Sequence, residues 1–202
     1  MPKTSSSFTV DERHYYKSGV SYDRVTSVLA PFNAGVSFMK ARNPNALAAK
    51  AATGKRAHLL AAKLARSEKI EDMLTQADPR AYNLFQSYEL WFSTAVKKVI
   101  AVEATLFSAD WRVAGTADLI AELKDGTKAV VDLKTGAASG TNQLQTAAYY
   151  HMAKNRWKGI NRRLVVYARE GGYSVAKHDD HEEDWDTFCA AVTVYRRIIS
   201  KE

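Results

Sequence analysis

The sequence predicts a mixed α/β fold in which helices flank a central β-sheet. Two runs rich in β-branched and aliphatic residues lie on either side of Lys124-Asp125-Gly126, a turn of the kind that Asp-Gly favours, so the chain is expected to form a β-hairpin there. An alanine-rich stretch before the hairpin and an amphipathic stretch at 180–201 predict helices. The 202 residues, 46% of them hydrophobic, can bury a sizeable core, most simply as one domain.

The order of the expected elements follows from turn and cap signals along the chain. Residues 1–15 are polar and are expected to be an irregular N-terminal segment, followed by a single domain at 16–202. The later elements are expected to be a short helix at 22–31, helices near 44–67 and 79–97, strands near 98–107, 112–123 and 128–134, a helix at 142–157, strands at 163–168 and 173–177, and a closing helix at 180–201.

Two of these elements carry specific signals. Asp78 can cap the helix that begins at Pro79, because aspartate accepts backbone N–H groups there and proline fits the first turn. The closing helix has an apolar stripe that is expected to lie in the core, and it consists of Trp185, Phe188, Val192, Tyr195 and Ile199.

The predicted hairpin carries charged residues where apolar ones are expected. Side chains alternate along a strand, so Asp132 and Lys134 point to one face, and antiparallel pairing brings Asp118 of the first strand near them. Two carboxylates that close repel each other and lose hydration, unless they are protonated or neutralised by a bound ion. Oxygen ligands of this kind suit Mg2+ or Mn2+. The alternative is a solvated sheet face on which Lys134 pairs with Asp132.

Three more residues lie on predicted helices. Gln145 and Tyr149 are four apart and therefore share one helical face, while His58 follows Gly54 in the alanine-rich helix. An imidazole at that place is a further candidate metal ligand. Taken singly, His58 is more often an ordinary surface or packed histidine, and Gln145 and Tyr149 are ordinary helix surface and core.

Taken in order, these motifs resemble the PD-(D/E)XK nuclease superfamily, and within it the RecB-like branch, which includes phage exonucleases. The resemblance covers about residues 22–155 and rests on four motifs: Gly54 to His58, Gly115 to Asp118, Asp132-Leu133-Lys134-Thr135, and Gln145 to Tyr149. It implies a restriction-endonuclease-like core with a central mixed β-sheet flanked by helices. Each motif is weak alone, and the ordered set is the signal.

The resemblance also implies roles for individual residues. His58, Asp118, Asp132 and the backbone carbonyl of Leu133 would bind one or two Mg2+ or Mn2+ ions. Lys134 would be the catalytic lysine, with Gln145 and Tyr149 holding the nucleic acid and that lysine in position. Glu103, in the strand before the hairpin, is left outside the site, because a solvated strand charge explains it equally well.

The implied function is a metal-dependent DNA exonuclease, encoded by a phage or prophage, that acts on linear single- or double-stranded DNA in recombination, repair or turnover. A single-strand annealing or single-strand-binding protein is an expected partner. The alternatives are an endonuclease on the same scaffold and a non-catalytic nucleic-acid-binding module. A closed circular substrate distinguishes the two nucleases, because an endonuclease nicks it.

Composition limits the remaining classes. The lone cysteine, Cys189, excludes an intramolecular disulfide and the four-cysteine iron-sulfur cluster of some RecB-like nucleases. No apolar run reaches the ~18 residues of a membrane span and the N-terminus lacks a signal-peptide core, so no membrane association and a cytoplasmic location are expected, in the bacterial host if phage encoded.

The charge balance favours a polyanionic partner. The formal net charge is +7, and basic residues gather just beyond the Gln145–Tyr149 helix, with Trp157 among them: Lys154, Arg156, Lys158, Arg162 and Arg163. Such a patch can follow a phosphate backbone. A solvated loop is an equally good explanation, since basic charge alone does not identify nucleic acid as the partner.

Overall fold

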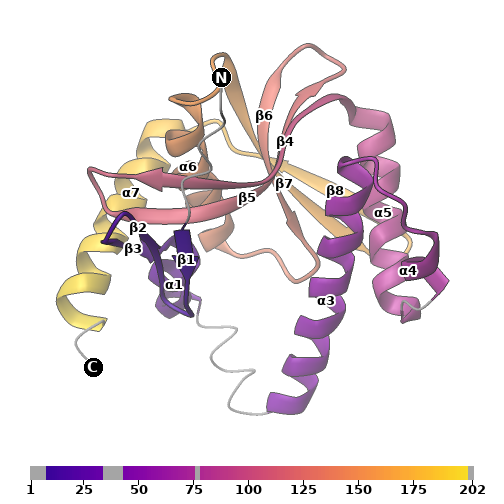
Figure 1. Cartoon of the computed structure of the whole chain (residues 1–202), viewed down its shortest axis with the longest axis horizontal. Helices are drawn as coiled ribbons and strands as arrows, with labels where there is room; N and C mark the ends of the chain where they lie inside the picture. The colour runs from indigo at the N-terminus through magenta and orange to yellow at the C-terminus, as the bar shows by residue number, and fades with distance from the viewer. Residues whose placement is uncertain (1–7, 34–42, 76–77, 200–202) are drawn as a thin grey trace.

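A computed structural model describes residues 8–33, 43–75 and 78–199 of the chain. Its central feature is a mixed eight-stranded sheet (Figure 1). The strands are β1 (Phe8–Val10), β2 (His14–Lys17), β3 (Val20–Arg24), β4 (Val96–Ser108), β5 (Val113–Leu123), β6 (Lys128–Lys134), β7 (Ile160–Arg169) and β8 (Gly172–Lys177). Their order is β1-β2-β3-β5-β6-β7-β8, with β4 paired to β5 as well. Two pairs, β3–β5 and β6–β7, are parallel, so the predicted mixed α/β fold is confirmed.

Helices cover both faces of this sheet. They are α1 (Val25–Leu29), α3 (Pro44–Ala65), α4 (Glu71–Thr75), α5 (Pro79–Ala95), α6 (Gly140–Lys154) and α7 (His181–Val194), with a 3-10 turn at Ala30–Phe32 and a π-helical turn at Tyr195–Ile199. The predicted cap is present, because the Asp78 side chain accepts the Ala81 N–H. No helix in the described ranges has the length and apolar character that a membrane crossing requires.

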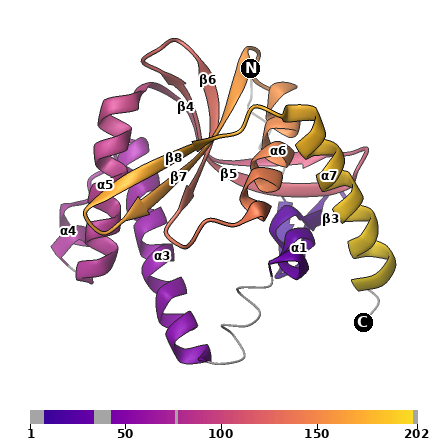
Figure 2. The ribbon, with the colours of Figure 1, turned by 180° about the vertical axis from the view of Figure 1, so that it is seen from behind.

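Strand alternation divides the core into two layers. Leu119 and Val131 pack with α3 and α5, whereas Ile120 and Val130 pack with α1, α6 and α7, and all four side chains are at most 1% exposed. Figure 2 shows α6 and α7 side by side on their face of the sheet, with α3 and α5 grouped at the opposite side of the molecule. The sheet is therefore the middle layer of a three-layer structure.

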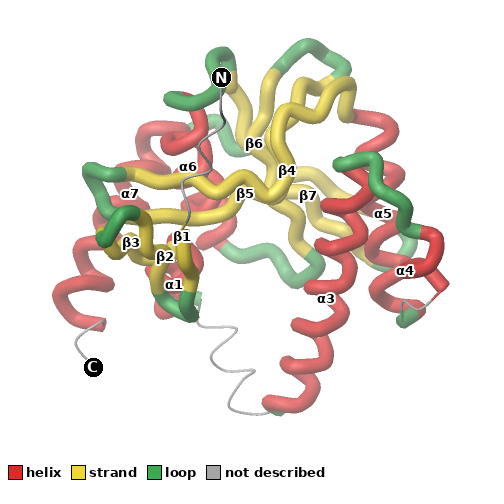
Figure 3. The backbone as a smooth tube through the Cα atoms, in the orientation of Figure 1, coloured by secondary structure: helices red, strands yellow, loops and turns green. Residues whose placement is uncertain are grey.

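The β5–β6 hairpin turns where the sequence predicts. Gly126 has a φ of +83°, and the Asp125 carboxylate accepts the N–H and hydroxyl of Thr127. Backbone pairing of the two strands extends from this turn to Leu119 opposite Val131. Beyond that point β5 continues along β4 while β6 continues along β7, so the sheet splits, as the tube in Figure 3 shows.

The predicted irregular segment at 1–15 is wrong for its described part. Residues 8–10 and 14–17 form β1 and β2, and Tyr15 is only 6% exposed, while residues 1–7 lie outside the described ranges. The cause is long-range packing, since Tyr15 meets Phe107 of β4 edge to face at 6.0 Å between ring centroids. A polar sequence with isolated aromatic residues gives no local sign of such a contact.

The short helix predicted at 22–31 also begins too early. Tyr22 to Arg24 complete β3, which pairs in parallel with β5, and the helix starts only at Val25. The Tyr22 ring packs 5.1 Å from that of Phe107. Pairing with a strand some 90 residues later therefore overrides the local helical pattern.

Candidate active site

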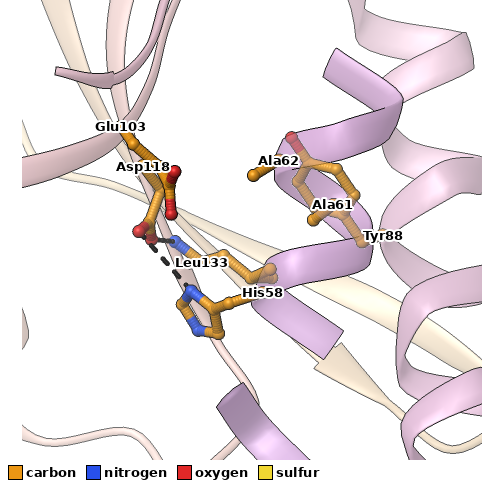
Figure 4. A pocket seen from close by; sticks show the side chains of 7 residues that line it. All are labelled: His58, Ala61, Ala62, Tyr88, Glu103, Asp118 and Leu133. Atoms are coloured by element: carbon orange, nitrogen blue, oxygen red, sulfur yellow. Dashed lines mark hydrogen bonds and ion pairs between the residues drawn. The ribbon is translucent and has the colours of Figure 1, made fainter. Parts of the chain in front are cut away.

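The split between β5 and β6 positions the first candidate carboxylate. Because the strands separate here, the Leu133 N–H of β6 is free of a β5 carbonyl, and Asp118 Oδ2 accepts it at 2.7 Å. The other oxygen, Oδ1, lies 3.4 Å from Nδ1 of His58 on α3. Figure 4 shows these two contacts beside a small cavity of about 10 Å³, the room of about one water molecule. Asp118 is thus held from both sides at the rim of a cavity.

Asp132 and Lys134 share one face of β6, as strand alternation predicts. The ammonium of Lys134 lies 2.8 Å from Asp132 Oδ2, and apart from this ion pair that buried oxygen has no hydrogen-bond partner within the part of the chain that is described. Asp132 is 2% exposed, whereas the Lys134 side chain retains 24% exposure. The buried carboxylate therefore has bonding capacity left, and a cation already lies beside it.

Gln145 connects the lysine to the carboxylate from the first turns of α6. Its Oε1 accepts Lys134 Nζ at 2.9 Å, and its Nε2 donates to Asp132 Oδ1 at 2.9 Å and to the Tyr149 hydroxyl at 3.0 Å. The amide thus fixes Lys134 and Asp132 relative to each other, and Tyr149, one turn along the helix, fixes the amide. These four residues form one network.

Burial and neighbouring charges shift the pKa values of the two aspartates in opposite directions, upward for Asp132 and downward for Asp118. Burial raises the pKa of Asp132 to about 6, although the Lys134 ammonium opposes the rise. Burial also acts to raise the pKa of Asp118, but His58 and the Leu133 N–H outweigh it and hold that pKa below its usual value. Burial acts to lower the pKa of His58, but the Asp118 carboxylate has the larger opposite effect. The pKa of His58 is therefore raised overall. In the absence of another cation, Asp132 is therefore the costly charge and Asp118 the stabilised one.

The two glycines of the sequence motifs stand where side chains approach closely. A Cβ built on Gly54 of α3 would lie 2.8 Å from the Thr135 hydroxyl, just after β6. A Cβ built on Gly115 of β5 would lie 2.5 Å from Cε1 of Tyr149, a ring that is 2% exposed. Glycine at these positions lets α3 and α6 approach the two strands that carry the acids.

Replacing Gly115 with alanine is therefore expected to lower the free energy of unfolding by about 1–3 kcal/mol, since the Tyr149 ring must leave its packed position. The melting temperature should fall by roughly 2–4 °C per kcal/mol. Gly172→Ala is the matched control, because a Cβ there meets nothing within 4 Å. Equal melting temperatures for the two variants would contradict this account of Gly115.

The residues of the candidate site have the right chemistry for a hard divalent cation, but their present positions do not form a complete binding site. Within the described ranges, no three His, Cys, Asp or Glu side chains are grouped tightly enough to hold a metal ion. The donor set nevertheless has the right chemistry, because Asp132 Oδ2 is paired with the Lys134 ammonium alone, Asp118 has further lone pairs, and Mg2+ keeps several waters and needs few protein ligands. At Leu133, the atom in contact with Asp118 is the amide N–H, whereas the implied ligand is the carbonyl.

The structure adds Arg66 and Tyr88 to this neighbourhood, which the sequence did not single out, and it places Glu103, left outside the site in the sequence analysis, beside the cavity. Arg66, the C-cap of α3, pairs with Glu103 at 2.5 Å, and Glu103 lines the same cavity as His58 and Asp118 (Figure 4). Tyr88 of α5 lines the cavity as well. Glu103 adopts a φ of +47°, which is unusual for a non-glycine residue inside a strand. No pattern in the sequence signals that conformation or the pairing with Arg66.

The family model of the PD-(D/E)XK nuclease superfamily matches residues 36–198. No curated protein matches the chain in sequence. Among solved structures, the chain is similar to the crystal structure of SSO0001, with 12% sequence identity and a TM-score of 0.42 over 92% of this chain and 76% of that chain. On the family match, which spans most of its length, the chain belongs to the PD-(D/E)XK nuclease superfamily.

Proposed function

We propose that this nuclease is a metal-dependent DNA exonuclease of the RecB-like branch, with Asp118, Asp132 and Lys134 at its centre. The observation that carries the proposal is the buried Asp132 carboxylate, whose Oδ2 has the Lys134 ammonium at 2.8 Å as its partner among the described residues. A carboxylate this costly to bury is expected to have a cation as its functional partner. The RecB-like assignment is supported by Gln145 of α6, which donates to Asp132, and by Tyr149, which accepts a hydrogen bond from Gln145.

The proposed roles follow from the contacts of each side chain. Asp118 and Asp132, with the Leu133 carbonyl and His58, hold one or two Mg2+ or Mn2+ ions. A bound divalent ion supplies an activated water and neutralises charge on the scissile phosphate. Lys134 lies at the open side of Asp132, where its ammonium can offset the negative charge that grows on the phosphate during attack. Gln145 and Tyr149 keep that ammonium in place.

Several finer features belong to the same proposal. The enzyme is inferred to be encoded by a phage or prophage, to work in the host cytoplasm on linear DNA during recombination, repair or turnover, and to cooperate with a single-strand annealing or single-strand-binding protein. Residues 16–202 are inferred to be one nuclease domain. The net charge of +7 supports a polyanionic substrate.

Digestion of end-labelled linear DNA tests the reaction. With Mg2+ or Mn2+ the linear substrate should be shortened from its ends, while a closed circle of the same sequence stays intact. Nicking of the circle would replace the exonuclease proposal by an endonuclease on the same scaffold. Intact linear and circular DNA with both metals, in the presence of folded protein, would leave a non-catalytic binding module.

A further inference from the structure

A second, larger hollow adjoins the candidate active site along the open edge of β4. This groove has a volume of about 660 Å³, and residues 101–107 of β4 follow one another along it. β4 pairs with β5, and no other described strand pairs with it. The groove is completed by Phe8 of β1, Lys17 of β2 and residues at and just after the end of α6, elements that Figure 1 labels.

The groove and the cavity of the candidate active site meet at one residue of the edge strand, Glu103, with α3 and α5 lining the cavity and the end of α6 lining the groove. Glu103 lines both, and the cavity side of that residue is shared with Asp118 and His58. Glu103 is the one acidic residue among the described groove residues, and its carboxylate is paired with Arg66. The Arg66 guanidinium therefore offsets the negative charge of Glu103 where the two hollows meet, which lowers the repulsion of a phosphate backbone that crosses the β4 edge between the groove and Asp118.

Two cation–ring pairs line the groove, and a further exposed ring lies beside one of them. The Lys17 ammonium lies 4.7 Å from the centroid of the Phe107 ring, and the Arg156 guanidinium lies 4.4 Å from that of Trp157. Phe8 packs edge to face against Phe107 at 5.8 Å and keeps 40% of its surface exposed. An open groove with positive charge and an exposed aromatic ring at Phe8 has the chemistry that binds single-stranded nucleic acid, in which phosphates follow the charges and a base stacks on the ring.

We propose that this groove carries a single strand of DNA to or from the candidate active site. The proposal rests on the proposed function and deepens it by naming an unpaired strand as the form of substrate at the site. Charge complementarity favours this occupant over an extended peptide added to the β4 edge, because a peptide has no general need for Lys17 and Arg156. Stacking on the exposed Phe8 ring requires unpaired bases, which a duplex does not offer.

The test measures binding in chelator, where cleavage cannot occur. Fluorescence anisotropy compares a labelled 20-nucleotide oligo-dT with a blunt 20-base-pair duplex for wild type, Arg156→Ala and Phe8→Leu. Arg80→Ala is the matched control, since it also removes one exposed arginine, on α5 away from the groove. Arg156→Ala should weaken oligo-dT binding severalfold and reduce the log–log salt slope by about 0.7, the value of one phosphate contact. Phe8→Leu should weaken it about fivefold or more through lost stacking.

Each outcome decides one of the two proposals. Selective loss of oligo-dT affinity in Arg156→Ala and Phe8→Leu, with Arg80→Ala within about twofold of wild type, supports the groove. Unchanged affinity in both groove variants overturns it and leaves a peptide as the occupant of the β4 edge, and equal losses on the duplex overturn the single-strand part. Cleavage by wild type with Mn2+ is scored separately, so a protein that binds through the groove without cutting refutes the proposed function alone.

Discussion

Replacing Lys134 with alanine is expected to reduce the single-turnover rate of DNA cleavage by roughly 10²–10³-fold, the usual loss when a group that stabilises developing charge is removed. Metal binding should persist, because Asp118 and Asp132 remain. Lys128→Ala is the matched control: it removes a lysine from the same strand, and its ammonium contacts the Lys158 carbonyl rather than the site. Calorimetry with Mn2+ and a cleavage assay under saturating metal separate binding from chemistry.

A second readout distinguishes catalysis from a merely structural lysine. The Lys134 ammonium opposes the burial that raises the pKa of Asp132 to about 6, so its removal should raise that pKa further. A metal ligand must be ionised to bind, and the acid limb of Mn2+ binding should therefore move to higher pH in Lys134→Ala. A variant that cleaves at the wild-type rate, with an unmoved acid limb, would show that Lys134 has no role in the site.

The grouping of side chains at the centre of the candidate site was predictable from the sequence because its signals are local. Alternation along a short strand places Asp132 and Lys134 on one face, and an Asp-Gly turn folds Asp118 back toward them. A four-residue helical step likewise stacks Gln145 on Tyr149. Each of these inferences needs only the geometry of one element, and the structure brings these residues together as a network with His58 beside Asp118.

The features that were missed depend on contacts between distant segments. The strands β1 and β2 exist because Phe8 and Tyr15 pack on Phe107, about 100 residues later. The split of the sheet at Asp118, the left-handed backbone of Glu103 and its pairing with Arg66 arise from how β4, β5, β6 and α3 meet. The sequence pattern of a single helix or strand does not indicate which distant elements it will contact. The cavity and the groove, which form between such elements, were therefore not predicted.

The two candidate metal ligands are expected to have opposite effects on stability when no metal is present. In chelator at pH 7, Asp132→Asn should be at least as stable as wild type, because it removes a buried charge whose pKa is raised to about 6. Asp118→Asn should be less stable than wild type, because it removes a carboxylate whose pKa is lowered by His58 and the Leu133 N–H. Each kcal/mol should shift the melting temperature by roughly 2–4 °C.

The pH dependence gives the sign of each effect independently. The unfolded pKa of an aspartate is about 3.9, so between about pH 4 and pH 6 the folded state holds a proton on Asp132 that the unfolded state has lost. That group makes the protein less stable as pH rises through this window. Asp118 acts in the opposite sense: its stabilisation is present above about pH 4 and is lost as pH falls through its lowered pKa. Melting curves of wild type and both variants from pH 3 to 8 measure the differences.

In chelator Asp132→Asn is expected to be at least as stable as wild type, and adding metal should make wild type the more stable of the two. Wild type should gain stability with Mn2+, by about 2.7 kcal/mol at 100 times the dissociation constant, because the ion binds the folded state alone. Neither amide variant should respond, since each lacks one of the proposed carboxylate ligands. The alternative is that Asp132 and Lys134 form a buried ion pair with a structural role only. In that case Asp132→Asn should be strongly destabilised in chelator, because Lys134 loses its partner. Mn2+ should then leave the wild-type melting temperature unchanged. That pattern would remove the metal from the site and, with it, the reaction proposed for this chain.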